Sequence, residues 1–201
     1  MKTFEFWYDF SSPYAYLGAT QVAALEARTG ARALWRPFLL GGLFHAIGGP
    51  EVPMMTWPDP KRRYTLLDIS RHANFYGVPF RWPSTFPMLT VAPLRLALAV
   101  PPEDLPRVSL AIYRAYWAAD RDIKDPKELS KILESLGLPT ALLEKTQDPA
   151  IKEALKVAGQ EALKKGLCGA PTYVVGDMVI WGQDRQIFVE RALAGWRPAC
   201  G

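Results

Sequence analysis

The spacing of apolar residues at the start of this 201-residue chain changes from alternating to helical and back. Residues 3–9, TFEFWYD, alternate and are rich in aromatic side chains, which is typical of a strand. Residues 13–29 have apolar positions at helical spacing, with a proline at the first position and Gly30 after the last. A second short strand fits residues 33–38. The pattern therefore predicts a β-α-β unit at the N-terminus.

The middle of the chain has a different pattern, which begins where the second strand ends near the Gly41-Gly42 pair. Stretches with helical spacing are separated by proline-rich loops, and the spacing predicts helices over residues 61–76, 90–99, 103–118, 127–136 and 150–165. The last of these helices is amphipathic, so one of its faces should pack on a core. We expect residues 40–166 to form a helical subdomain.

The C-terminal stretch returns to short strands. In YVVGDMVIW two apolar runs flank a Gly-Asp pair, which is a strong hairpin signal, and QDRQIFVERALAG after it has helical spacing. A β-α-β unit and a β-β-α unit separated by helices are the two halves of a thioredoxin fold. We therefore predict an α/β thioredoxin-like fold, with residues 1–39 and 167–201 as the thioredoxin-like domain and residues 40–166 as a large all-helical insertion.

Composition and charge narrow the class of partners. Hydrophobic residues make up 49% of the chain and charged residues 22%, which is typical of a globular protein. The formal net charge is only +4, with lysine and arginine scattered, so we expect no nucleic-acid partner.

No apolar stretch approaches the roughly 18 residues that cross a bilayer. Glu5 and Asp9 also interrupt the region where a signal peptide would be apolar. We expect a soluble cytoplasmic protein without a membrane partner.

The two cysteines, Cys168 and Cys200, are far apart in sequence and fit no C-x-x-C or metal-ligand spacing. With only His45 and His72 beside them, we expect no metal site. Nothing next to Cys168 in sequence would lower its pKa, so we interpret it as a buried structural cysteine.

The first candidate site is the motif DFSSPY, residues 9–14, at the predicted strand-to-helix junction. A helix N-terminus has unpaired N–H groups and the positive end of the helix dipole, so it stabilises an anion. Serines stand here in place of cysteines, which excludes protein dithiol-disulfide exchange at this position. Ser12 is either only an N-cap or a hydroxyl that donates a hydrogen bond to an external thiolate.

The energies allow the second interpretation. Lowering the pKa of a thiol from about 8.5 to about 6.5 requires roughly 2.7 kcal/mol. A helix end supplies up to about 2 kcal/mol, and a hydrogen bond to a charged group about 1.5 to 3 kcal/mol. Ser12 and the helix terminus together can therefore keep a bound thiol ionised near neutral pH.

Two later motifs can complete such a site. In GAPT, Pro171 is either an ordinary strand-start proline or part of a cis-proline loop that leaves the backbone of Ala170 free to pair with an extended peptide ligand. In WGQDR, Asp184 is either a helix cap or a contact for a ligand ammonium, while Gln183 faces a carboxylate. A γ-glutamyl group carries both charges.

The ordered set D-F-x-S-P-Y, G-A-P-T and W-G-Q-D-R resembles the bacterial 2-hydroxychromene-2-carboxylate isomerases. That family is a branch of the DsbA-like thioredoxin superfamily and is close to kappa-class glutathione transferases. The likeness extends through PFLLGG, K-x-x-Y-x-x-x-D-x-x-R starting at Lys61, GVP at residues 77–79 and FP at residues 86–87. It covers nearly the whole chain.

The resemblance implies a role for each motif. Ser12 would activate the sulfur of glutathione or another small thiol, and Ala170, before cis-Pro171, would pair with its cysteinyl backbone. The γ-glutamyl group would contact Gln183 and Asp184. Lys61 would contact a glutathione carboxylate.

The implied reaction is the cis-trans isomerisation of a small aromatic substrate through reversible thiolate addition, and the resemblance also implies a homodimer. Trp57, Tyr64, Phe86 and Trp181 are either walls of the substrate pocket or ordinary core residues. Two other functions stay open. One is a kappa-like glutathione transferase or peroxidase, and the other is a non-catalytic thioredoxin-like binding domain in which Ser12 is only a cap.

Overall fold

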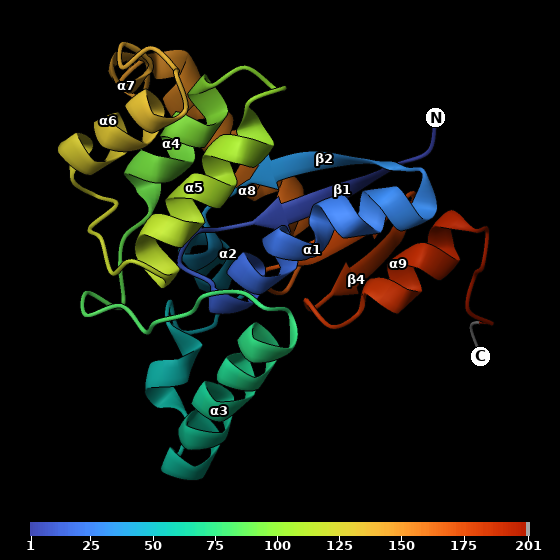
Figure 1. Cartoon of the computed structure of the whole chain (residues 1–201). Helices are drawn as coiled ribbons and strands as arrows, with labels where there is room; N and C mark the ends of the chain where they lie inside the picture. Colours follow the sequence, from blue (N-terminus) through green and yellow to red (C-terminus); the bar gives the residue numbers. More distant parts are fainter. Residues whose placement is uncertain (200–201) are drawn as a thin grey trace.

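The computed structural model describes residues 1–199 and has one four-stranded sheet at its centre (Figure 1). The strands are β1 (Thr3–Tyr8), β2 (Arg32–Pro37), β3 (Thr172–Val175) and β4 (Met178–Trp181), in the order β2-β1-β3-β4. β1 runs parallel to β2 and antiparallel to β3, which forms a hairpin with β4. The two ends of the chain therefore pair directly, and the predicted α/β fold of β-α-β and β-β-α halves is confirmed.

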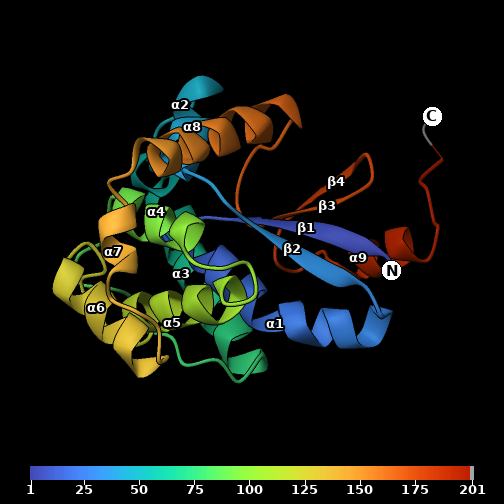
Figure 2. The same cartoon turned by 90° about the horizontal axis from the view of Figure 1, so that it is seen from above.

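Helices cover both faces of the sheet. Figure 2 shows α1 (Pro13–Thr29) on one side and α8 (Pro149–Lys164) on the other. The short helix α9 (Gln186–Leu193) contacts α1 and β3. The start and end of α1 are those predicted, because Ser12 caps its N-terminus, a proline occupies the first turn and Gly30 adopts the left-handed conformation after the last turn. This helix directs its N-terminus to the end of β1.

All five helices predicted in the middle of the chain are present, each within two residues of its predicted ends. They are α3 (Asp59–Phe75), α4 (Val91–Ala99), α5 (Leu105–Trp117), α6 (Pro126–Ser135) and α8. The sequence pattern missed three short elements, which are α2 (Leu40–Ala46), a 3-10 helix (Pro53–Thr56) and α7 (Leu142–Lys145).

The presence of α2 overturns the expectation that Gly41-Gly42 follows directly on a strand. Each glycine costs a helix about 1 kcal/mol relative to alanine, so local preference argues against a helix here. Tertiary contacts prevail, because the first N–H of α2, on Leu40, donates to the Asp9 carboxylate at 2.7 Å. Leu40 and Leu43 are also buried.

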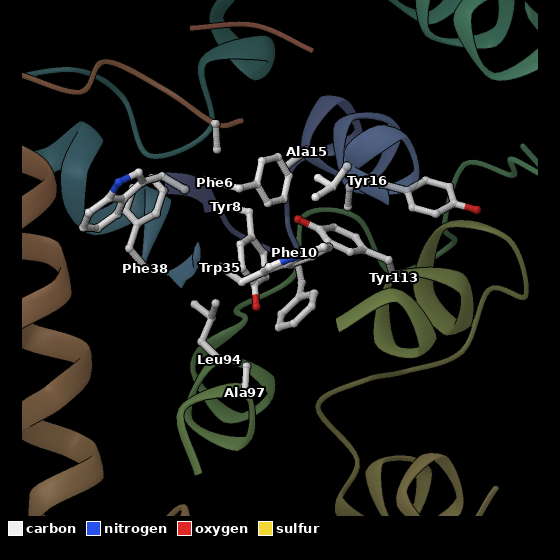
Figure 3. Packing of buried hydrophobic residues seen from close by; sticks show 14 of the residues in the cluster. Phe6, Tyr8, Phe10, Ala15, Tyr16, Trp35, Phe38, Leu94, Ala97 and Tyr113 are labelled. Atoms are coloured by element: carbon white, nitrogen blue, oxygen red, sulfur yellow. The ribbon is translucent and has the colours of Figure 1, made fainter. Parts of the chain in front are cut away.

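An aromatic cluster joins the sheet to the middle helices (Figure 3). Phe6 and Tyr8 of β1 stack at 5.5 Å between ring centroids, and Tyr8 meets Trp35 of β2 edge-on at 5.3 Å. Phe10 meets Tyr113 of α5 at 4.9 Å. All five side chains are buried and belong to one continuous core. Since this core runs through both expected domains, the boundaries at residues 39/40 and 166/167 stay a prediction.

Helix α3 extends away from the sheet and carries a narrow buried stripe (Figure 1). Thr65, Ile69 and Ala73 are its buried residues, at intervals of one helical turn, and Ile69 and Ala73 pack with Leu17 of α1. The stripe attaches α3 beside the N-terminal half of α1. No helix within residues 1–199 is long and apolar enough to cross a membrane.

Candidate active site

Ser12 lies where the N-terminus of α1 meets the loop before β3. Its hydroxyl oxygen accepts a hydrogen bond from the Ala15 N–H at 3.1 Å and is the N-cap of the helix. The same hydroxyl donates to the carbonyl oxygen of Ala170 at 2.9 Å, and Ser12 is only 6% exposed. Ser12 is therefore the N-cap of α1, and its proton is engaged by the late loop. A role toward a thiol stays a prediction.

The Ala170-Pro171 peptide bond is cis, which agrees with the second of the two interpretations of Pro171. Two glycines allow its surroundings to pack closely. A Cβ on Gly18 of α1 would lie 3.0 Å from Pro171 Cγ, and a Cβ on Gly169 would lie 2.4 Å from Trp181 Nε1. Because that second distance is shorter than any ordinary contact, the Trp181 ring can lie over the loop only while residue 169 is glycine.

The turn after β4 is tied to the same loop. The Gly182 N–H donates to the Pro171 carbonyl at 3.0 Å, which places Gln183 and Asp184 beside the cis-proline. Gln183 is 2% exposed, and its Oε1 accepts a hydrogen bond from the Tyr76 hydroxyl at 2.7 Å. The structure thus brings together five of the six predicted site residues, which are Ser12, Ala170, Pro171, Gln183 and Asp184.

Asp184 is not a helix cap. The N-cap position of α9 belongs to Arg185, and no side chain caps that helix. The Asp184 carboxylate instead pairs with the Arg185 guanidinium at 2.5 Å and stays 43% exposed. The cap interpretation of Asp184 is therefore wrong, and its carboxylate remains accessible to a ligand.

Asp184 also borders an open hollow of about 420 Å³ between α3 and the β4–α9 turn. The other lining residues come from α3 and its C-cap, and they are Tyr64, Asp68, Arg71, His72, Phe75 and Tyr76. The Tyr14 hydroxyl donates to Asp68 Oδ2 at 3.4 Å. Burial, together with the negative charges of Asp68 and Asp184, raises the pKa of Tyr14 to about 12. Two carboxylates therefore lie around one neutral phenol at the edge of the hollow.

Lys61 is the predicted site residue that the structure does not place with the others. It stands exposed in the first turn of α3, and its Nζ lies 4.1 Å from the centroid of the Trp57 ring. It does not line the hollow, although it lies one turn before Tyr64 on the same face of α3. A role for Lys61 stays a prediction.

The four aromatic candidates for a substrate wall fall into different environments. Tyr64 and Trp181 are 61% and 56% exposed, and Tyr64 lines the hollow. Phe86 packs against Trp82 and Trp117 at 4.7 and 6.1 Å between centroids, as a core residue does. The Trp57 ring lies under the Lys61 ammonium in a cation–π contact.

Sequence reasoning missed the residue that fixes the loop before Ser12. Asp9 is fully buried, and its carboxylate accepts hydrogen bonds from the Ser11 N–H, the Leu40 N–H and the Thr90 hydroxyl. Burial raises the pKa of this carboxyl, and the hydrogen bonds oppose the shift. Asp9 thus joins the loop to the first turns of α2 and α4. The only sequence signal was its place in the DFSSPY motif.

Two side chains of α5 hold the same loop by donating hydrogen bonds to the backbone carbonyl oxygens of that loop. The Tyr113 hydroxyl donates to the Asp9 carbonyl at 3.0 Å, and Trp117 Nε1 donates to the Phe10 carbonyl at 2.8 Å. Both side chains are buried. Residues of α5 therefore help to position the N-terminus of α1.

Cys168 differs from its predicted state. Its side chain is exposed, so the interpretation as a buried structural cysteine is wrong. The residue follows Leu167, which is buried, at the start of the loop that reaches the cis-proline. Partial burial of the sulfur still raises the pKa of the thiol above its ordinary value. Cys200 lies outside the described residues.

Known proteins are similar to this chain in sequence and architecture. The family described as DSBA-like thioredoxin domain matches residues 3–194. The 2-hydroxychromene-2-carboxylate isomerase of Sphingobium xenophagum is 31% identical over 195 residues, covering 96% of this chain and 98% of that protein. Glutathione S-transferase kappa 1 of Rattus norvegicus is 28% identical over 200 residues, covering 92% of this chain and 87% of that protein.

A solved structure of a 2-hydroxychromene-2-carboxylate isomerase has the same fold, with a TM-score of 0.82, 21% identity and coverage of 96% of this chain and 95% of that one. The chain belongs to the DsbA-like thioredoxin family and, within it, resembles the 2-hydroxychromene-2-carboxylate isomerases and kappa-class glutathione transferases, as the sequence motifs predicted.

Proposed function

We propose that this protein is a glutathione-dependent isomerase of the 2-hydroxychromene-2-carboxylate type, acting on a small aromatic compound in the cytoplasm. The observation that carries the proposal is the hydrogen bond from Ser12 to Ala170 at the N-terminus of α1. The names of the relatives support both the isomerase activity and the use of glutathione, because one relative is an isomerase and the other is a glutathione transferase.

The Ser12–Ala170 bond suits a thiol ligand because it occupies two groups that such a ligand would use. Turning the Ser12 hydroxyl away from Ala170 frees one donor for a sulfur anion and one carbonyl for a peptide N–H. One neutral hydrogen bond, with a net value of about 1 kcal/mol, is exchanged for a charge-assisted bond of about 1.5 to 3 kcal/mol and a backbone bond. The exchange favours the ligand-bound arrangement.

The neighbouring residues suit the rest of a glutathione molecule. Asp184, although paired with Arg185, stays exposed enough to attract the γ-glutamyl ammonium. The hollow beside it is lined by a second carboxylate, Asp68, and by the Arg71 guanidinium. Gln183 faces the γ-glutamyl carboxylate. Lys61 lies on the same face of α3 as Tyr64. Its ammonium attracts a carboxylate of the ligand through solvent.

When bound, the thiol supplies a nucleophile that adds reversibly to the conjugated substrate, permits rotation about the resulting single bond and is eliminated again. Ser12 and the N–H groups of the first turn of α1 hold the negative charge on sulfur before addition and after elimination. Exposed aromatic surface is offered by Trp181 over the cis-proline loop and by Tyr64 in the hollow.

Thiol binding and isomerisation test the proposal separately. We expect glutathione to change the tryptophan fluorescence, and a Trp181→Phe variant to lose most of that signal because the Trp181 ring lies over the cis-proline loop. We also expect the protein to equilibrate the chromene with its ring-opened isomer only when thiol is present. A protein that binds no thiol would instead be a non-catalytic binding domain.

A kappa-like glutathione transferase is the second candidate, because a kappa-class enzyme is 28% identical over most of the chain. It would share the thiol site and differ in the electrophile. Conjugation of a generic electrophile, without turnover of the chromene, would favour this candidate. A homodimer is expected from the resemblance alone, and light scattering of the purified protein would test it.

A further inference from the structure

Asp9 is a fully buried acid that the proposed reaction does not use. One of its carboxylate oxygens accepts from the Ser11 N–H at 2.9 Å, and the other accepts from the Leu40 N–H at 2.7 Å. The Thr90 hydroxyl lies 2.6 Å from the first oxygen. Backbone N–H groups can only donate, and each oxygen faces one. The arrangement therefore suits an ionised carboxylate better than a carboxylic acid.

The titratable groups packed around Asp9 are uncharged at neutral pH. They are Tyr8 of β1 and Tyr113 and Tyr116 of α5, and burial raises the pKa of each phenol well above its ordinary value. The negative charge of Asp9 adds to that rise in all three. Every polar contact of the carboxylate also comes from a neutral group. Its charge is therefore felt by other groups nearby.

Asp9 and Ser12 are the two ends of one tight turn. The Ser12 N–H donates to the Asp9 carbonyl at 3.1 Å, so the two Cα atoms lie within about 7 Å of each other. A sulfur that accepts from the Ser12 hydroxyl would then lie roughly 10 Å from the Asp9 carboxylate. At an effective dielectric constant of about 20, two negative charges at that distance repel enough to raise the pKa of a thiol by about one unit.

We propose that Asp9 is a positioning residue that tunes the nucleophile, because its negative charge opposes ionisation of a thiol bound at Ser12 and so keeps the thiolate reactive. The inference rests on the proposed thiol-binding function. A thiolate becomes a weaker nucleophile as the pKa of its thiol falls, and the best attacking thiol has a pKa near the working pH. Ser12 and the end of α1 favour the thiolate, and Asp9 limits how far they do so.

Asp9→Asn tests the inference, because it removes the charge and keeps the size of the side chain. In an ultraviolet titration of bound glutathione, we expect the thiol pKa of this variant to fall by about one unit below that of the wild type. Loosening of the turn acts in the opposite direction. A displaced Ser12 or helix end would stabilise the thiolate less and would raise the thiol pKa. The sign of the shift therefore separates charge from structural damage.

The pH dependence of turnover at saturating glutathione gives a second readout. Turnover of Asp9→Asn should begin to rise about one pH unit lower than turnover of the wild type. At high pH, where both thiols are ionised, it should level off about two- to three-fold lower, because the thiolate is less nucleophilic. The two profiles should therefore cross. Turnover that is lower than wild type at every pH would overturn the inference.

Tyr113→Phe is the matched control on the same turn. It removes the hydroxyl that donates to the Asp9 carbonyl at 3.0 Å, and it removes no negative charge. The thiol pKa of this variant should stay at the wild-type value or rise. A fall equal to that of Asp9→Asn would show that loosening of the turn is enough, and it would overturn the inference.

The outcomes separate the inference from the function on which it rests. A folded Asp9→Asn protein whose bound thiol has the wild-type pKa, or a higher one, would overturn the tuning role and leave the proposed function intact. If Asp9→Asn fails to fold, the neutral variant Asp9→Ser is judged by the same shift. A wild-type protein that binds no glutathione would overturn the proposed function, and the inference with it.

Discussion

The hydroxyl of Ser12 donates to the carbonyl of Ala170 at 2.9 Å, and this bond joins segments that stand 158 residues apart in the chain. It forms because β1 and β3 are neighbours in the sheet, so the loop after β1 and the loop before β3 meet at the same edge. A donor at the positive end of a helix and a backbone acceptor thus share one location.

Asp184→Asn should weaken thiol binding more than it lowers turnover. The substitution removes the charge that attracts the ligand ammonium and keeps the size of the side chain. Since Asp184 is 43% exposed, solvent screens the interaction, and we expect the dissociation constant of glutathione to rise about three- to ten-fold. Asp177→Asn, in the β3–β4 turn, is the control, and calorimetric titration of both variants checks this. An unchanged affinity would remove Asp184 from the site.

Lys61→Gln should weaken glutathione binding only at low salt. The Lys61 ammonium lies over Trp57 on an exposed part of α3, so its attraction for a carboxylate acts through solvent. We expect a loss of about two- to five-fold at low ionic strength that disappears above about 0.5 M salt, where the screening length falls below about 5 Å. Lys124→Gln is the control on another exposed lysine. A loss that persists at high salt would indicate direct contact.

Asp9→Ala should destabilise the fold more than removal of a surface cap. It leaves the partly buried Ser11 N–H, the buried Leu40 N–H and the buried Thr90 hydroxyl without their acceptor. Relief of a buried charge offsets part of this cost, since burial raises the pKa of Asp9. We expect a net loss of about 2 to 5 kcal/mol in urea unfolding.

The control for Asp9 is Asp125→Ala. Asp125 caps α6 by accepting from the Lys127 N–H at 2.9 Å, and its loss should cost about 0.5 to 2 kcal/mol. Equal losses in the two variants would show that Asp9 is no more than a local cap.

Cys168 should react slowly with iodoacetamide at neutral pH. The thiolate is the reactive form, and partial burial raises the pKa of this thiol above the ordinary value, so the thiolate fraction is small at pH 7 and grows as the pH rises through the elevated pKa. In a Cys200→Ser protein the rate should still be increasing above pH 9. A plateau below pH 8 would contradict this. Cys168→Ser should keep the proposed isomerase activity, because the proposed nucleophile comes from the ligand.

Local signals explain which parts of the fold were predicted. An N-cap serine, a proline in the first turn and a glycine after the last defined α1, and Gly-Asp between two apolar runs defined the β3–β4 hairpin. The proximity of Ser12 to Ala170 followed from recognising two halves of one fold. These features depend on neighbouring residues or on the order of the elements.

The features that were missed depend on contacts between distant segments. Helix α2 contains Gly41-Gly42 and depends on Asp9, which stands 31 residues before Leu40. The face of α3 that meets the β4–α9 turn, and the bond from Tyr76 to Gln183, leave no trace in local spacing. The exposure of Cys168 also depends on how its loop leaves α8, and sequence neighbours gave no guide to it.

Ser12→Ala should separate folding from thiol activation. Loss of the N-cap costs about 0.5 to 2 kcal/mol, so the variant should remain folded and should still bind glutathione through Asp184 and the cis-proline loop. Activity should fall because less of the bound thiol is ionised at neutral pH. Ser11→Ala is the matched control, since it keeps the hydrogen bond that the Ser11 backbone N–H donates to Asp9 at 2.9 Å.

The ultraviolet absorbance of the bound thiolate, followed against pH in wild type and Ser12→Ala, tests the central claim most directly. We expect the bound thiol of the wild-type protein to ionise about two pKa units below a free thiol. In Ser12→Ala the pKa should rise by about one to two units, the value of one hydrogen bond to a charged sulfur. Equal pKa values in the two proteins, or a wild-type value no lower than that of free glutathione, would contradict the account.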